Sequence, residues 1–256
     1  PGGKIARWEI PGNSPIGVTI VNGFGTTAAQ DGLVAARIFD ALNKGKKRRP
    51  TITVFDYRGL GESTGIPAHE ISFSRMRVDA AAVLKETAGP QIVFGASLGG
   101  NTALLWTQRD FEQAQRFYAP RKVLAVVALN PADITRIEDI ELKSRHFMRQ
   151  MRHKHGVRGI TPAHAQAFVE DGRRHGVKDT LSPRNLTQKV FAAPVILIQG
   201  DKDEIVSAAY NEQLARESHG PGILFVPIKG MGHDPAKNPS ALADLLTRRF
   251  MLNGKD

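Results

Sequence analysis

Ser97 lies in a sequence pattern that could make its hydroxyl a nucleophile. The segment 95–100, GASLGG, has small residues around the serine and stands between the apolar run 91–94 and a helical pattern that begins at Leu98. A tight turn between a strand and a helix lifts the hydroxyl above the strand, and small neighbours let the two elements approach closely. The helix N-terminus also offers unpaired N–H groups to an oxyanion. The pattern therefore predicts hydrolytic or acyl-transfer chemistry at Ser97, with a base to accept its proton.

The elements that must position this serine alternate between strands and helices. Continuous apolar, β-branched runs predict strands at 17–22, 51–56, 91–95, 123–130, 195–199 and 223–227. Runs of this kind are typical of strands buried on both faces, hence of a parallel sheet. Amphipathic stretches predict helices near 30–43, 71–88, 98–109, 206–218 and 239–252. The alternation predicts an α/β, doubly wound, mostly parallel sheet, to which residues 7–10 add an antiparallel edge strand.

Residues 131–190 interrupt this alternation. They show no strand pattern, and a capping residue followed by proline at Thr161-Pro162 and at Ser182-Pro183 indicates several short helices. Because the preceding strand ends at the edge where such sheets bind ligands, we expect this segment to be a small helical lid over that edge. The predicted organisation is a core of residues 1–130 and 191–256 with a lid inserted at 131–190.

Several ordered segments, together with GASLGG, resemble the α/β-hydrolase superfamily from about residue 5 to residue 252. They are NGFG at 22–25, DYRGLGES at 56–63, GDKDEIV at 200–206 and GMGH at 230–233. The resemblance implies the α/β-hydrolase fold and a catalytic triad in the order Ser, Asp, His. Asn22 departs from the family pattern, in which histidine is common at this position, and we expect its amide to organise the loop.

The resemblance implies a role for each member of the triad. Ser97 is the nucleophile, and His233 is the base, since imidazole titrates near neutral pH and can return the proton to the leaving group. Asp203 is the carboxylate that orients the imidazole. Asp201, two residues earlier, and Asp133, after the strand that ends at residue 130, are the alternative positions for the acid.

The resemblance also implies an oxyanion hole made by the backbone N–H groups of Phe24 and Leu98.

The lid contributes apolar side chains that either line an acyl pocket or simply pack beneath the lid. These side chains are Phe147, Met148, Met151 and Phe168.

The composition excludes several kinds of covalent link and binding site. The chain has no cysteine, which excludes disulfides, thiolate catalysis and thiolate metal ligands. His153 and His155 have no carboxylate partner nearby in the sequence, so we expect no metal site and no cofactor. No apolar run approaches the roughly 18 residues that a membrane helix needs. The chain begins at Pro1 without a methionine, which leaves its compartment open; a soluble, cytoplasmic protein is favoured.

The formal net charge is +10, and much of it falls in two regions. Residues 44–49 carry five Lys and Arg, and residues 130–190 carry twelve against seven Asp and Glu. We expect these charges to be solvated surface, although peripheral membrane contact or a lipidic or anionic substrate is compatible with them. The basic residues lack interleaved aromatics for base stacking, so we expect no nucleic-acid partner.

The leading functional hypothesis is a serine hydrolase that cleaves a carboxylic ester or thioester through an acyl-serine intermediate. The same triad could serve C–C bond hydrolysis, lactone opening or acyl transfer, because pocket shape rather than motif separates these reactions. The non-enzymatic alternative is a binding protein that retains the fold. That alternative predicts a broken triad, whereas all three residue types are present.

Overall fold

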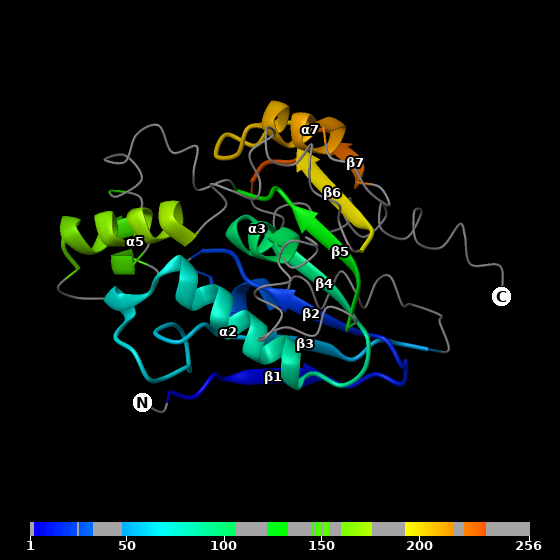
Figure 1. Ribbon diagram of the computed structural model, residues 1–256, viewed down its shortest axis with the longest axis horizontal. Helices are drawn as coiled ribbons and strands as arrows, with labels where there is room; N and C mark the ends of the chain where they lie inside the picture. Colours follow the sequence, from blue (N-terminus) through cyan, green and yellow to red (C-terminus); the bar gives the residue numbers. More distant parts are fainter. Residues whose placement is uncertain are drawn as a thin grey trace.

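One seven-stranded sheet organises the described part of the chain in this computed structural model (Figure 1). The structure describes residues 3–24, 26–32, 48–105, 122–132, 145, 147–149, 151–153, 160–175, 193–217 and 223–233. The strands are β1 (Arg7–Ile10), β2 (Gly17–Val21), β3 (Ile52–Phe55), β4 (Gln91–Ala96), β5 (Val123–Leu129), β6 (Val195–Gly200) and β7 (Ile223–Ile228). They lie in the order β1-β3-β2-β4-β5-β6-β7.

The pairing of the strands confirms the predicted fold class. Strand β1 pairs antiparallel with β3, and the other neighbouring pairs are parallel. The sheet is therefore doubly wound and mostly parallel, with the expected antiparallel edge strand. Each strand bound differs from its predicted bound by one residue at most.

Burial on both faces explains the continuous apolar runs. In β5, Val126 and Ala128 belong to one buried cluster, whereas Val127 and Leu129 belong to a second. Successive side chains of a strand point to opposite faces, so a sheet covered on both faces requires an apolar residue at every position.

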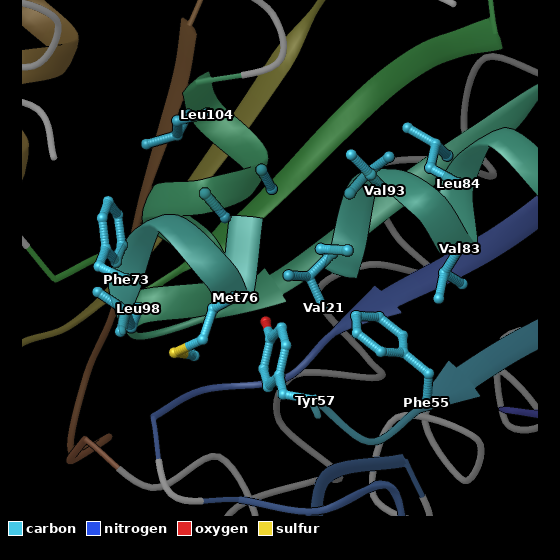
Figure 2. Close-up of a cluster of buried hydrophobic side chains, with 14 of the residues drawn as sticks. Val21, Phe55, Tyr57, Phe73, Met76, Val83, Leu84, Val93, Leu98 and Leu104 are labelled. Atoms are coloured by element: carbon cyan, nitrogen blue, oxygen red, sulfur yellow. The ribbon is translucent and has the colours of Figure 1, made fainter. Parts of the chain in front are cut away.

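The helices cover this sheet and join its strands. The described helices are α2 (Phe73–Glu86), α3 (Leu98–Leu105), α5 (Pro162–His175) and α7 (Ala208–Glu217), with shorter turns η1 (Ala28–Gly32) and η2 (Ala68–Glu70). Figure 2 shows Met76 and Leu84 of α2 in the same buried cluster as Val93 of β4. The predicted helices at 71–88, 98–109 and 206–218 are therefore present as far as they are described. Most of 30–43 and all of 239–252 lie outside the described residues.

The segment 131–190 is partly described. Its described residues at 147–149, at 151–153 and in α5 are helical. Helix α5 begins at Pro162, directly after Thr161, as the capping pattern predicts, while Ser182-Pro183 lies outside the described residues. In Figure 1, α5 lies beyond the carboxyl ends of the parallel strands, beside the N-terminal end of α2.

Within the residues that the structure describes, no helix is long and apolar enough to cross a membrane.

Candidate active site

Ser97 occupies the turn between β4 and α3 with a backbone φ of +53°. This left-handed conformation is uncommon for a residue with a side chain, and such strain is concentrated at functional sites. A Cβ atom at Gly95 would lie 2.3 Å from the carbonyl oxygen of Gly99, and one at Gly99 would lie 2.1 Å from that of Val21. The glycines therefore allow α3 to pack directly against β4 and the end of β2, which holds the serine at the strand end.

His233 links Ser97 to Asp203. Its Nε2 atom lies 3.0 Å from Oγ of Ser97, and its Nδ1 atom lies 2.8 Å from Oδ2 of Asp203. An ionised carboxylate can only accept a hydrogen bond, so Nδ1 carries the proton and Nε2 is free to accept from the serine hydroxyl. The imidazole is 21% exposed, whereas the Asp203 side chain has no exposed surface. The three side chains thus form a hydrogen-bonded chain from a buried carboxylate to the partly buried Ser97.

The environment of Asp203 keeps its carboxylate ionised. Burial by itself would raise the pKa of this carboxyl, but hydrogen bonds from His233 and from the backbone N–H groups of Val206 and Ile205 together lower its pKa below the ordinary 3.8. Both N–H groups lie 2.8 Å from Oδ1, so each carboxylate oxygen has its own partners. This arrangement fixes the carboxylate toward the imidazole.

Asp201 contacts a different group. Its Oδ1 atom accepts a hydrogen bond from the Gly230 N–H at 2.6 Å, and the Lys202 N–H donates to the Met231 carbonyl at 3.0 Å. A Cβ atom at Gly200 would lie 2.2 Å from the Met231 oxygen. Asp201 therefore joins the loop of Asp203 to the loop of His233. Asp133, the other alternative acid, lies outside the described residues.

The loop after β2 carries Phe24, one of the two expected oxyanion donors. The Asn22 side-chain amide donates to the Phe55 carbonyl, and the Tyr57 hydroxyl donates to the Asn22 carbonyl at 2.9 Å. Both contacts tie this loop to the end of β3, so the Asn22 amide organises it as expected. Leu98, the other expected donor, is the first residue of α3, where a backbone N–H has no acceptor within the helix.

The apolar residues expected at the pocket belong to or pack against one buried cluster, against which Phe24 also packs. The Phe24 ring lies 5.2 Å from the Phe147 ring and 4.7 Å from the Phe168 ring, measured between centroids. Phe147, Met151 and Phe168 are buried, and Met148 packs against the same cluster while partly exposed. Each expected pocket residue therefore packs in the cluster that includes Leu98 and contacts Phe24. This placement is compatible with a pocket lining and with packing beneath a lid.

No role was predicted from the sequence for Asn130, whose side chain contacts the loops of both Asp203 and His233. An asparagine at the end of a strand is equally typical of an ordinary turn, so the sequence carried no separate signal. Across the described residues, no group of three or more His, Asp or Glu side chains could hold a metal ion.

Known proteins with the same fold resemble this chain in sequence and in structure. The model of the alpha/beta hydrolase family matches residues 20–245. The rat protein named palmitoyl-protein thioesterase ABHD10, mitochondrial, is 28% identical over 191 residues, which are 70% of this chain and 57% of the relative. This chain thus spans little more than half the length of that relative.

Two solved structures share the fold. Alpha/beta hydrolase domain-containing protein 10 from mouse superposes with a TM-score of 0.67 at 23% identity, covering 96% of this chain and 92% of that one. The monoacylglycerol lipase of Paleococcus ferrophilus superposes with a TM-score of 0.63 at 19% identity, covering 97% of both chains.

Proposed function

Because this chain belongs to the alpha/beta hydrolase family, we propose that it is a serine hydrolase that cleaves a carboxylic ester or thioester through an acyl intermediate on Ser97. The observation that supports the proposal most is the hydrogen-bonded chain from Ser97 through His233 to Asp203, with distances of 3.0 and 2.8 Å. Serine is a weak nucleophile at neutral pH, and a base in direct contact removes that limitation.

The proposed reaction has two halves. As Oγ of Ser97 attacks the acyl carbonyl carbon, Nε2 of His233 takes the hydroxyl proton and then returns it to the departing alcohol or thiol. Water next attacks the acyl-serine, its proton passes to His233, and the carboxylic acid leaves as Ser97 regains a proton. Asp203 stays ionised throughout, because its role is to hold the Nδ1–H tautomer and stabilise the imidazolium.

The negative charge of each tetrahedral intermediate would be stabilised by backbone donors. Leu98 lies beside the nucleophile at the N-terminus of α3, where the helix dipole favours an anion. Phe24 lies in the loop that the Asn22 amide ties to β3. These two N–H groups are proposed as the oxyanion hole, and the hole needs no particular side chain at either position.

The apolar side chains that contact Phe24 support a proposed substrate class. Phe147 and Phe168 come from the segment 131–190. Phe147 stacks on Phe24 and Phe168 contacts it at a tilt, so this segment is proposed as a lid with an apolar underside. Such a surface suits an acyl chain, which has little polar area. The name of the rat relative, a palmitoyl-protein thioesterase, supports acyl thioesters and long acyl chains as the first substrates to test.

A fluorophosphonate probe tests the nucleophile. The parent chain should become labelled at Ser97, and Ser97→Ala should lose both the labelling and at least about 10⁴-fold of the turnover of an activated ester. Ser72→Ala is the matched control, because the Ser72 hydroxyl caps the N-terminus of α2, where it accepts a hydrogen bond from the Arg75 N–H. Full labelling of folded Ser97→Ala would contradict the proposal.

The substrate class requires a separate measurement. Matched series of acyl thioesters and oxygen esters, from acetyl to palmitoyl, should show kcat/KM rising with chain length, because a longer chain buries more apolar surface. A C–C bond substrate or a lactone that is turned over faster than every ester would replace this assignment while leaving the triad in place.

A further inference from the structure

Asn130 stands at the carboxyl end of β5, next to the strand that carries Ser97. Its backbone φ is +43°, and among the described residues only Ser97 shares a positive φ without being a glycine. Asparagine adopts this conformation more readily than most residues with a side chain. Asn130 is also only 1% exposed, so its amide must find partners within the protein.

The side chain of Asn130 bonds to the loops of both the acid and the base. Its Oδ1 atom accepts a hydrogen bond from the Gly200 N–H at 2.8 Å, three residues before Asp203. Its Nδ2 atom donates to the Gly232 carbonyl at 3.1 Å and to the carbonyl of His233 itself at 3.2 Å. One planar amide thus sets the separation of the two loops whose side chains meet in the triad.

The backbone beside Asn130 contacts Ser97, the third residue of the proposed triad. The Ala132 N–H donates to the Ser97 carbonyl at 3.0 Å, and the Asn130 N–H donates to the Ile198 carbonyl at 2.8 Å. Residues 130–132 therefore contact the segments of the nucleophile, the acid and the base. Ordinary strand pairing accounts for the backbone bonds of Asn130, but it does not account for the bonds of its side chain to the His233 loop.

We propose that Asn130 is a positioning residue, which holds the backbone of His233 at the distance from the Asp203 loop that aligns the imidazole with Ser97. The proposal rests on the proposed function of the triad. Only an amide supplies an acceptor for one loop and two donors for the other, since aspartate lacks the donors and an apolar side chain lacks both. Small errors in alignment cost rate, because proton transfer requires hydrogen-bond geometry.

Two substitutions separate this role from a role in folding. Asn130→Asp keeps an acceptor for Gly200 but places carboxylate oxygens against the carbonyls of Gly232 and His233. Asn130→Gly tolerates the positive φ and removes every side-chain bond. Thr19→Val is the matched control, because it removes another buried hydrogen bond, from Thr19 to Gln91 within the sheet. The rate of fluorophosphonate labelling, kcat and KM for an activated ester, and the melting temperature are measured for each.

Both Asn130 variants should label at least about ten-fold more slowly, with kcat reduced and KM within about two-fold of the parent value. Thr19→Val should melt earlier but keep the parent labelling rate. In the background of Asp203→Asn, the further effect of Asn130→Gly should shrink to less than about three-fold, because residues that act through one imidazole are not additive.

The outcomes are distinguishable. The positioning role would be overturned if either folded Asn130 variant were labelled at the parent rate. It would also be overturned if Asn130→Gly had the same effect in the parent and in Asp203→Asn, or if both Asn130 variants failed to fold. An unfolded Asn130→Gly beside a fully active Asn130→Asp would also overturn it, as a role in the fold alone. A parent chain that is not labelled at Ser97 would instead reject the proposed function.

Discussion

Asp203 and Asp201 lie two residues apart in one loop, yet their carboxylates have different partners. Asp203 contacts the imidazole of His233, whereas Asp201 accepts a hydrogen bond from the Gly230 backbone. An amide at position 201 keeps an oxygen that can accept this bond. An amide at position 203 loses the charge that stabilises an imidazolium and can favour the wrong tautomer.

The first prediction compares these two carboxylates. Asp203→Asn should lower kcat about 10³-fold to 10⁴-fold, and Asp201→Asn should lower it by less than about ten-fold. Steady-state kinetics on an activated ester, with circular dichroism to check the fold, provide the measurement. Equal losses in the two variants would contradict the assignment of Asp203 as the acid.

The second prediction concerns the pH dependence of stability. The pKa of the Asp203 carboxyl is lowered in the folded chain, so below about the ordinary 3.8 the unfolded state binds a proton that the folded state does not. The contribution of Asp203 is fully present above this value and is lost as pH falls through the lowered pKa. The free energy of unfolding of the parent should therefore fall more steeply with acidification below about pH 4 than that of Asp203→Asn. Urea titrations across this range measure it, and parallel curves would refute the linkage.

At the scale of elements, α2 is bound at both ends by residues distant in the sequence. At its C-terminal end, the Lys122 ammonium donates to the carbonyls of Leu84, at 3.1 Å, and Lys85, at 3.0 Å. At its N-terminal end, the Asp171 carboxylate of α5 accepts from the Ser74 N–H at 2.8 Å and from the Ser74 hydroxyl at 2.9 Å. Both charges suit the helix dipole. The second contact connects the segment 131–190 to the core.

The third prediction removes this connection. Asp171→Ala should lower the free energy of unfolding by about 1–2 kcal/mol, because two hydrogen bonds to a charged group are lost. If α5 belongs to a lid, KM for long acyl substrates should rise several-fold while kcat is retained. Glu217→Gln, which removes a carboxylate from α7, is the control for loss of a helix charge. An unchanged stability and KM would show that this contact does not hold α5 in place.

At the scale of the whole molecule, the net charge of +10 raises the question of an anionic substrate. Arg145, Arg149 and Arg152 of the segment 131–190 are exposed, and Arg152 donates to the Ile160 carbonyl at 3.1 Å. At 0.1 M ionic strength, salt largely screens the interaction between exposed charges that lie more than about 10 Å apart. These three charges are therefore expected to solvate the surface rather than to select a substrate.

The fourth prediction follows from that exposure. Changing Arg145, Arg149 and Arg152 together to glutamine should leave the ratio of kcat/KM for anionic and neutral esters of equal acyl length within about two-fold at physiological ionic strength. Measuring the same ratio at low salt reveals any long-range steering, which salt should abolish. A fall in the ratio that persists in salt would show that these arginines contact the substrate.

The sequence by itself determined the strands, the helix α2 and the turn at Ser97. Each depends on neighbours in the chain: continuous apolar residues in a strand buried on both faces, the amphipathic pattern of a helix, and small residues at a close approach. The order of the motifs also indicated that Ser97, Asp203 and His233 meet, because a parallel sheet brings its strand ends to one edge.

Only the tertiary structure decided which partner each polar side chain contacts. Asp203 and Asp201 have the same chemistry and differ by two positions, and the loops that follow β6 and β7 place one against His233 and the other against Gly230. Asn130 acquires its partners from residues 70 to 103 positions away. Hydrogen bonds act over about 3 Å and require alignment, so separation along the chain carries no information about them until the sheet has brought the loops together.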